Sequence, residues 1–403
     1  MFTLRRAALF LAVLPLLLVA PLRTNAQATL ADLYTAKASL ASPTSALQPV
    51  LQRLLDDAAK VITQKPRSVL DKKQGLAGID PHAYVSYAPY FWPNPDKPDG
   101  LPFIRKDGKR NAAQVALGDE NNAGAIKRAA CNLILADYFK SNPEYVKHAA
   151  LLLRTWFLDP KTRMLPHLDN GQAIPGGVLG RKEGVIEWRD LTTVLLCLEL
   201  LDKSPVWSVD DQKAMRVWLS DYYTWLTTSK IGVAEKKAGN NHGCWWDVQA
   251  TALALYLGKT DDARAIAEEF KTKRITEQLQ PDGTLPRELA RADSWGYSTF
   301  NLTAMCAMAD YAKRVGVDLW GYKTTDGRSL RGALEYLIPF ADGSKPWPHE
   351  NDPTHKVDGS KLVLPLLRAS QAFGEPSYTE RAKTLGKASW DTLRERLFIP
   401  NTR

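Results

Sequence analysis

The sequence predicts an all-α protein, a single-domain, incomplete (α/α) toroid or barrel built from antiparallel helix pairs. Three observations lead to this prediction. Apolar residues recur at helical spacing along nearly the whole chain, period-2 strand patterns are scarce, and long loops rich in Pro, Gly and Trp separate the periodic segments. No short repeat of constant length is present, which argues against a regular solenoid.

We expect about a dozen helices. The apolar periodicity predicts helices over residues 123–139, 148–157, 190–202, 211–229, 248–257, 261–279, 302–315, 330–340, 361–373 and 378–397. Long loops are expected at 84–107, 159–188, 235–241, 281–297 and 342–359. Their Trp, Tyr, His and Arg content is not that of disordered segments, so we expect these loops to gather at one rim of the toroid and to serve the function.

Residues 1–28 have the features of a secretory signal peptide, which leaves 29–403 as the toroid domain. Arg5 and Arg6 precede an apolar run, and Ala26-Gln27-Ala28 forms a cleavage site. No later segment is apolar for long enough to cross a bilayer. We therefore expect an exported protein, periplasmic or secreted, without a membrane anchor after cleavage and monomeric.

Charge and cysteine content narrow the function classes. The formal net charge of +9 falls to +6 when Arg5, Arg6 and Arg23 are removed with the leader. This mild excess, without runs of Lys and Arg, argues against nucleic-acid binding and suits an anionic ligand. The cysteines show neither a disulfide framework nor a CxxC metal pattern, so we expect buried free thiols at positions 131, 197, 244 and 306.

Two polar clusters each precede an apolar helix. The first is Asn241 and His242 with Trp245 and Trp246, ahead of the helix from Val248. Amide and imidazole groups are costly to bury unless they are paired, so a core helix does not need them. The second cluster follows about fifty residues later, ahead of Leu302, and contains Arg287, Glu288, Arg291, Asp293, Trp295 and Tyr297. The N-terminus of a helix favours an anion, so both clusters suit an acidic ligand.

The residue types favour β-elimination from a uronic acid. Glycoside hydrolysis normally needs two carboxylates that flank the bond, and neither cluster has an obvious pair. His242 stands alone, so we expect no metal site and no cofactor. In elimination, Asn and His stabilise the enolate-like transition state by hydrogen bonds to the carboxylate. A Tyr is the base, and a nearby Arg is expected to lower its pKa.

Four ordered motifs resemble the alginate lyase domain family of secreted polysaccharide lyases with an (α/α) toroid. The motifs are YAPYFWPNP…GLPFIRKDGKRN, AIPGG…GRKEGVIEW, NNHGCWW and PDGTLPRELAR…YSTFNL, and the resemblance covers the chain from about Tyr84 to Leu366. The resemblance implies that Asn241 and His242 neutralise the uronate carboxylate, that Arg291 is the active-site arginine and that Tyr297 is the catalytic tyrosine.

The chain departs from the best-known members of the family at one point. Those enzymes have paired tyrosines followed by a histidine, whereas Ser298 and Thr299 follow Tyr297 here. The GYSTFNL form resembles enzymes that act on glucuronan as well as on mannuronate-rich alginate. β-Mannuronate and β-glucuronate share their configuration at C4 and C5, so one tyrosine is expected to serve both in a syn elimination. The predicted partner is therefore an anionic uronan.

Further side chains are candidates for substrate contacts. We expect the 84–107 loop to form a lid or wall with Trp92, and one of Trp245 and Trp246 to face the cleft. The remaining candidates are Arg105, Gln172, Arg181, Glu288, Trp295 and His349.

Structural and functional alternatives remain at this stage. Asn241 and His242 would also suit the N-terminal cap of a helix from Cys244. Glu288 and Arg291 would suit an ion pair, with Glu288 orienting Arg291 in either case. An (α/α)-barrel glycoside hydrolase would draw two carboxylates from Glu187, Asp190, Asp247 and Glu288, and a non-catalytic uronan-binding protein is the third alternative.

Overall fold

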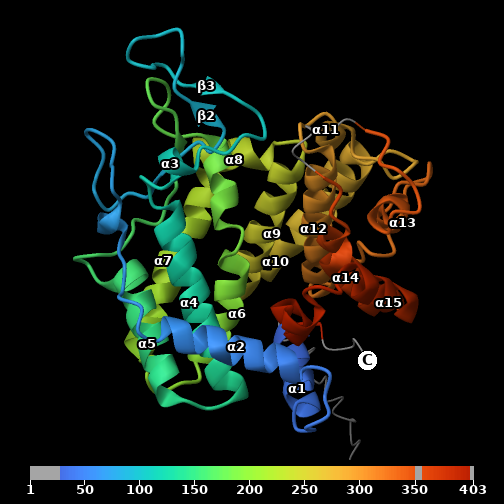
Figure 1. The fold of residues 1–403 in the computed structure, drawn as a ribbon. Coiled ribbons are helices and arrows are strands. Elements are labelled where there is room, and N and C mark those ends of the chain that lie inside the picture. Colours follow the sequence, from blue (N-terminus) through green and yellow to red (C-terminus); the bar gives the residue numbers. More distant parts are fainter. Residues whose placement is uncertain (1–27, 350–355, 400–403) are drawn as a thin grey trace, which may run out of the picture.

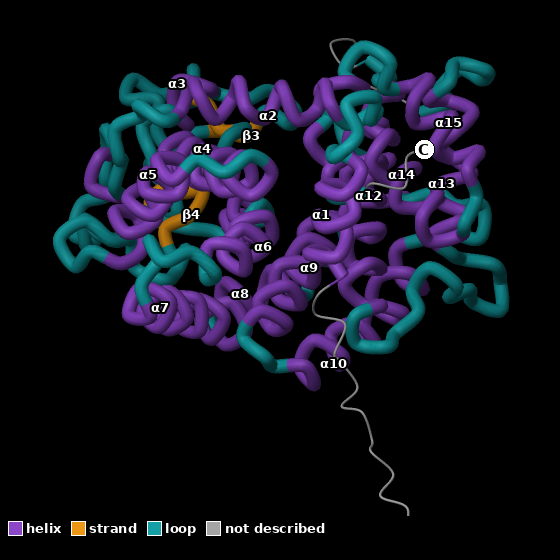
Figure 2. The backbone as a smooth tube through the Cα atoms, turned by 90° about the horizontal axis from the view of Figure 1, so that it is seen from below, coloured by secondary structure: helices purple, strands orange, loops and turns teal. Residues whose placement is uncertain are grey.

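The computed structural model describes residues 28–349 and 356–399. The predicted signal peptide, apart from Ala28, and part of the predicted 342–359 loop lie outside the described residues. The described chain is a ring of helix pairs (Figures 1 and 2). Within this part of the chain no helix combines the length and the apolar character that a bilayer span requires.

The inner helices of the ring pack on one another in chain order. They are α4 (Glu120–Phe139), α6 (Leu191–Leu201), α9 (Asn241–Tyr256), α12 (Ser294–Lys313) and α14 (Val363–Phe373). The outer layer contains α5 (Pro143–Leu153), α7 (Val209–Thr228), α10 (Thr260–Phe270), α13 (Leu330–Ala341) and α15 (Pro376–Leu385). α5, α10, α13 and α15 each pack on the inner helix beside them, which confirms the predicted all-α toroid of helix pairs.

The two ends of the chain meet and close the ring. α2 (Gln48–Val61) contacts the C-terminal 3-10 turns η7 (Trp390–Thr392) and η8 (Arg394–Leu397) and also packs on α4, while α1 (Ala28–Ser39) contacts η8. The prediction of one helix over 378–397 is wrong for the second half of this range. α15 ends at Leu385 because Gly386 follows as its C-cap, and the remainder forms the two 3-10 turns.

Burial explains why the inner helices are apolar on nearly every side. α9 and α12 touch inner helices on both flanks and outer helices behind them, so most of their residues, like most of those of α6, join one core. α10, by contrast, buries a single stripe. All four cysteines are buried and unpaired, which confirms the prediction.

Short elements and loops collect at one end of the ring. They include α3 (Ala112–Val115), α8 (Lys230–Lys236), α11 (Pro286–Leu289) and two small sheets, with β1 (Val85–Tyr87) parallel to β4 (Asn170–Ala173) and β2 (Phe91–Trp92) antiparallel to β3 (Ile104–Arg105). Figure 1 shows β2, β3, α3, α8 and α11 at the top of the ring, where α9 and α12 begin. The predicted rim of loops is present, and both polar clusters open onto it.

The remaining helical segments are short. They are η2 (Val69–Asp71), η4 (Lys182–Trp188), η6 (Gly359–Leu362) and the π-helical turns η3 (Arg154–Leu158) and η5 (Lys271–Thr276), which extend α5 and α10.

Candidate active site

Asn241 stands in the first turn of α9 and is held by a buried carboxylate. Its backbone N–H and its Nδ2 donate to the two oxygens of Glu288, at 2.6 and 2.8 Å. α9 begins at Asn241 after Asn240, whose side chain makes no capping bond. The alternative that Asn241 and His242 cap a helix starting at Cys244 is therefore wrong.

Glu288 supports Asn241 instead of pairing with Arg291. Its Oε1 also accepts a hydrogen bond from Asn301 Nδ2 at 3.0 Å. Burial raises the pKa of Glu288, and the hydrogen bonds from Asn241 only partly oppose this rise. Three N–H donors fix the carboxyl group, and the carboxyl group fixes the Asn241 amide. The expectation that Glu288 orients Arg291 through an ion pair is thus wrong, and Glu288 lies behind Asn241, where it does not line the active-site cavity.

His242 is oriented by a second buried carboxylate. Its Nδ1 lies 2.6 Å from Oε1 of Glu235, a residue with no exposed surface, and Lys182 Nζ lies 3.5 Å from the other carboxylate oxygen. A carboxylate accepts hydrogen bonds, so Nδ1 carries a hydrogen and Nε2 is left for the cavity. Asn241 and His242 thus form a clamp whose two members are each fixed from behind by a glutamate.

Tyr297 and Arg291 form the second half of the site. Arg291 Nη2 donates to the Tyr297 hydroxyl at 2.8 Å, and that hydroxyl donates to the Tyr90 hydroxyl at 3.0 Å. Arg291 also binds both carboxylate oxygens of Asp107, through Nε at 3.1 Å and Nη2 at 2.8 Å. Burial tends to raise the pKa of Asp107, but the hydrogen bonds and charge of Arg291 outweigh burial and lower it to about 2.

The pKa of Tyr297 is raised, contrary to the expectation that Arg291 would lower it. Burial is the largest cause, and the hydrogen bond with Tyr90 adds to it, while the positive charge of Arg291 acts in the opposite direction and is outweighed. The phenol is therefore protonated near neutral pH in the substrate-free protein.

One cavity of about 450 Å³ brings the four predicted catalytic residues together. Asn241, His242, Arg291 and Tyr297 all line this active-site cavity, as do three predicted substrate-binding residues, Arg105, Gln172 and Arg181. Six arginine and lysine side chains in its wall favour an anionic ligand: Arg105, Arg110, Arg181, Lys182, Arg189 and Arg291.

The opposite charge is also present in this wall. Glu120 bonds Arg110 at 2.9 Å, and Glu187 accepts a hydrogen bond from Tyr84 at 2.7 Å. Burial, with the charge of Glu120 second, raises the pKa of Glu187 to about 8. Gln172, beside them, has a φ of +52°, a strained value for a residue other than glycine and one often found at functional sites.

The carboxylates expected of a glycoside hydrolase do not form a pair in the cavity. Asp190 binds Lys127, and Asp247 is buried against Arg274 at 2.6 Å. Of the four candidates only Glu187 lines the active-site cavity, and its neighbour there is Glu120.

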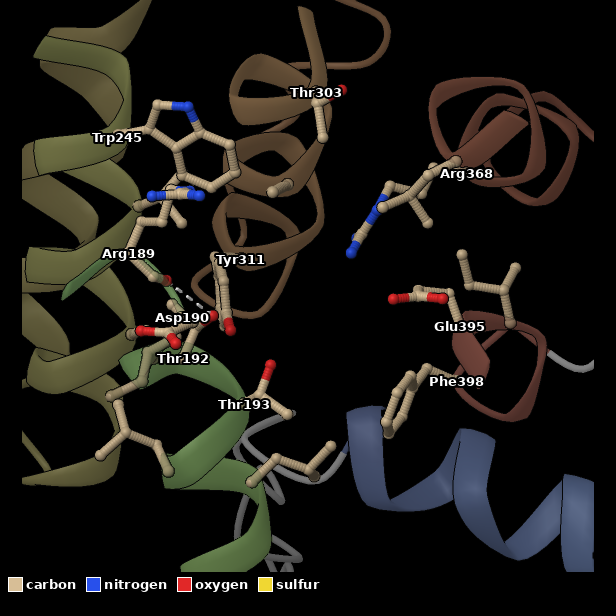
Figure 3. A pocket seen from close by; sticks show the side chains of 18 of the residues that line it. Arg189, Asp190, Thr192, Thr193, Trp245, Thr303, Tyr311, Arg368, Glu395 and Phe398 are labelled. Atoms are coloured by element: carbon tan, nitrogen blue, oxygen red, sulfur yellow. Dashed lines mark hydrogen bonds between the residues drawn. The ribbon is translucent and has the colours of Figure 1, made fainter. Parts of the chain in front are cut away.

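The tryptophans of the two clusters do not contact this cavity. Trp246 is buried and donates to the Leu226 carbonyl, and Trp295 is buried against Trp347. Both were expected as substrate contacts and are core residues instead. Trp245 points into a separate cavity of about 280 Å³ inside the ring, the inner hollow, where Arg189, Tyr311 and Arg368 also lie (Figure 3). It packs against Phe300, with ring centroids 5.1 Å apart.

Two other predicted contacts lie outside the lining of the active-site cavity. The Trp92 indole donates to the Lys109 carbonyl and lies under the Lys106 ammonium, and His349 bonds the Tyr336 hydroxyl at 2.7 Å. Neither side chain lines the active-site cavity, so these two predictions are not supported.

Sequence reasoning missed Tyr90, Asp107 and Glu235. Tyr90 and Asp107 belong to the motif YAPYFWPNP…GLPFIRKDGKRN. Its aromatic and charged residues predicted a wall of the cleft, but they did not indicate the contacts with Tyr297 and Arg291. Glu235 stands seven residues before His242, at the end of α8. Because Asp107 and Arg291 are 184 residues apart, no local pattern indicates their contact.

Comparison with known proteins gives one family and one fold. The family described as Alginate lyase matches residues 68–347. The crystal structure of an alginate lyase from Bacteroides ovatus is 36% identical, covers 92% of this chain and 97% of that chain, and has a TM-score of 0.85. No curated protein matches the chain.

A more distant structure shares the fold alone. A histidine-to-alanine variant of alginate lyase A1-III, complexed with a tetrasaccharide, is 18% identical, covers 87% of this chain and 88% of that chain, and has a TM-score of 0.58. The source of alginate lyase A1-III is Sphingomonas species A1.

Proposed function

The chain belongs to the alginate lyase family and is a polysaccharide lyase of uronan polymers, and we propose that it cleaves β-1,4-linked mannuronate or glucuronate by syn β-elimination. The observation that carries this proposal is the shared cavity. It brings Asn241, His242 and Tyr297 together, although Tyr297 is more than fifty residues away from the other two in sequence.

The clamp binds the carboxylate of the sugar that loses its C5 proton. Asn241 Nδ2 carries two hydrogens, of which one is given to Glu288, so the other serves the substrate. His242 offers Nε2 while Glu235 holds Nδ1. Hydrogen bonds to the carboxylate spread the negative charge that develops when the C5 proton leaves, which lowers the barrier.

Tyr297 moves a proton from C5 to O4. Its phenolate takes H5, the electron pair of the C5–H bond forms the C4=C5 double bond, and the C4–O4 bond breaks. The same hydroxyl then protonates the departing O4, so proton and charge balance within one residue. Because burial raises the pKa of Tyr297, its proton must first leave for solvent: Tyr297 gives it to the Tyr90 hydroxyl, and Tyr90 releases its own proton to water. Arg291 stabilises the resulting phenolate.

The substrate class follows from stereochemistry and charge. H5 and O4 lie on the same face in β-mannuronate and β-glucuronate, so one hydroxyl reaches both. The similar structure from Bacteroides ovatus is an alginate lyase, which supports mannuronate, and the GYSTFNL sequence form supports glucuronan as well. We further propose that residues 29–403 work as one exported, monomeric domain after removal of residues 1–28.

The test is a Tyr297→Phe protein assayed on polymannuronate, polyguluronate, glucuronan, hyaluronan and pectate. The unsaturated uronate absorbs in the ultraviolet. We expect the native protein to produce it from polymannuronate, from glucuronan or from both. Tyr297→Phe should lower kcat by about 10³-fold or more. Tyr311→Phe is the matched control, because Tyr311 stands on the same helix but lines the inner hollow, and it should keep full activity.

Product mass separates this proposal from its alternatives. Hydrolysis adds one water to the products and elimination does not. A native protein whose products are saturated, or one that binds uronan without turnover, would contradict the elimination.

A further inference from the structure

A further cavity, distinct from the inner hollow, lies on the side of Tyr297 away from the active-site cavity. This far cavity, of about 430 Å³, is lined by Tyr90, Tyr297 and Phe300, which also line the active-site cavity, and by residues of its own. Those are Gly108, Asp293, Gly296, Thr299, Thr303 and Lys361. The far cavity therefore follows the first turns of α12, and the catalytic hydroxyl belongs to a side chain that borders both spaces.

Elimination chemistry requires such a position. The proton is taken from C5 of one sugar and given to O4, the oxygen that joins this sugar to the next one. A residue that does both must stand between two neighbouring sugars. Since the carboxylate clamp is in the active-site cavity, the sugar that departs with O4 is the one on the far side of Tyr297.

Every sugar of a uronan carries a carboxylate, so the far cavity has to accept an anion. Of the side chains that line it, all within the described residues, Lys361 alone is cationic. Its Nζ lies 3.5 Å from Oδ2 of Asp293, longer than a good N–H···O hydrogen bond. Asp293 is already engaged, because its Oδ1 accepts the backbone N–H of Gly296 at 2.8 Å as the N-cap of α12.

Lys361 can meet a ligand, although its ammonium is in a long ion pair with Asp293. Its side chain keeps 39% of its surface exposed, and no described residue accepts a hydrogen bond from its ammonium. The residue stands in η6, which packs on α12, and it lies outside the 68–347 range that matches the family. The cation is thus supplied by a part of the chain that lies C-terminal to the residues of the family match.

We propose that the far cavity binds the uronate that departs with O4 and that Lys361 binds the carboxylate of this sugar. This inference rests on the proposed elimination. Tyr297 then stands between two carboxylate sites, the Asn241–His242 clamp for the sugar that becomes unsaturated and Lys361 for its neighbour. Phe300 lines both cavities and forms part of the shared wall.

The first test compares Lys361→Met, Lys361→Arg and, as a matched control, the exposed Lys323→Met, which lines neither cavity. We expect Lys361→Met to raise KM for the preferred uronan about tenfold and to leave kcat within about twofold, because a charge-assisted hydrogen bond is lost away from the reacting atoms. Lys361→Arg should stay close to the native KM, and Lys323→Met should be unchanged. An unchanged KM in Lys361→Met would overturn the proposal.

The second test removes the substrate carboxylate that Lys361 is proposed to bind. Oligouronates are prepared with the carboxyl group of the departing sugar reduced to an alcohol. The native protein should lose about tenfold in kcat/KM on them, whereas Lys361→Met should process reduced and unreduced substrates alike. Equal losses in both proteins would place the carboxylate elsewhere and overturn the proposal.

A binding measurement separates this inference from the proposed function. Calorimetric titration of saturated oligouronates into Tyr297→Phe and into Tyr297→Phe with Lys361→Met needs no turnover. About tenfold weaker binding in the double variant supports the role of Lys361, even if the native protein shows no elimination. Equal affinities of the two proteins contradict this role, even if elimination is established.

Discussion

The two halves of the active site are held in place by different kinds of contact. On the clamp side, Asn241 and His242 are fixed by Glu288 and Glu235, which are both buried and stand 47 and 7 residues away. On the tyrosine side, Arg291 is fixed by Asp107, which is partly exposed and stands 184 residues away on the loop that follows β3. The clamp is therefore a product of the helical core, whereas the tyrosine side is complete only when the loop is docked.

This difference separates stability from catalysis. A change behind the clamp removes a buried partner and should affect folding as well as activity. A change at Asp107 should alter the chemistry with little effect on folding, because partly exposed ion pairs contribute little to stability. Four changes, in order of expected effect, test the distinction.

The largest effect is expected from Glu235→Gln. The variant removes the negative charge that holds Nδ1–H of His242, so the imidazole loses its fixed orientation and kcat should fall by about 10²- to 10³-fold. Steady-state kinetics measures this, with the partly exposed Glu269→Gln as the control. A variant with native kcat would show that His242 needs no support from Glu235.

Glu288→Gln should follow, with a loss of stability of about 1–3 kcal/mol. Asn241 and Asn301 direct three N–H donors at this carboxyl group, and a glutamine offers only one oxygen, so a buried donor loses its acceptor. Urea unfolding followed by circular dichroism gives the value. Native stability in this variant would contradict the description of the clamp as part of the core.

Asp107→Asn should lower kcat/KM by about tenfold and change the unfolding free energy by less than about 1 kcal/mol. The amide no longer pairs with the guanidinium, so Arg291 is less firmly held beside Tyr297. Faster hydrogen exchange across residues 84–111 would report the undocked loop. A loss of stability as large as that of Glu288→Gln would break the comparison between the two halves.

The low pKa of Asp107 also fixes the pH range of this contact. The folded-state pKa of about 2 lies below the ordinary value of 3.8, so the contribution of the pair is present above pH 3.8 and is lost as pH falls toward 2. The docked loop should therefore be insensitive to pH between 5 and 9.

The smallest effect is expected from Glu187, whose pKa is raised to about 8 by burial and by Glu120. Below pH 8 this carboxyl group is neutral, and above it a second charge joins Glu120 in the cavity wall and repels the uronan. KM should rise about threefold between pH 7 and 9. The ionisable groups bonded to these two carboxyl groups are Tyr84, which donates to Glu187, and Arg110, which binds Glu120.

A Glu187→Gln protein provides the check for this last prediction. Glutamine keeps the side chain neutral at every pH, so KM should remain flat between pH 7 and 9 while kcat follows the native profile. A KM rise identical to that of the native protein would assign the alkaline effect to another group.

The sequence by itself determined the helical toroid, the buried cysteines and the four residues that share the cavity. Each of these depends on a local pattern. Apolar periodicity reports which side of a helix is buried, and the two polar clusters stand at the starts of α9 and α12, which the ring brings to the same rim.

Only the tertiary structure decided which partners hold those residues. Asp107 and Tyr90 reach Arg291 and Tyr297 from 184 and 207 residues away, so no spacing in the sequence records the contact. The protonation of Tyr297 and the burial of Trp246 and Trp295 were decided in the same way. A pKa and an exposed fraction are set by everything that packs around a side chain, and that packing exists only once the ring has closed.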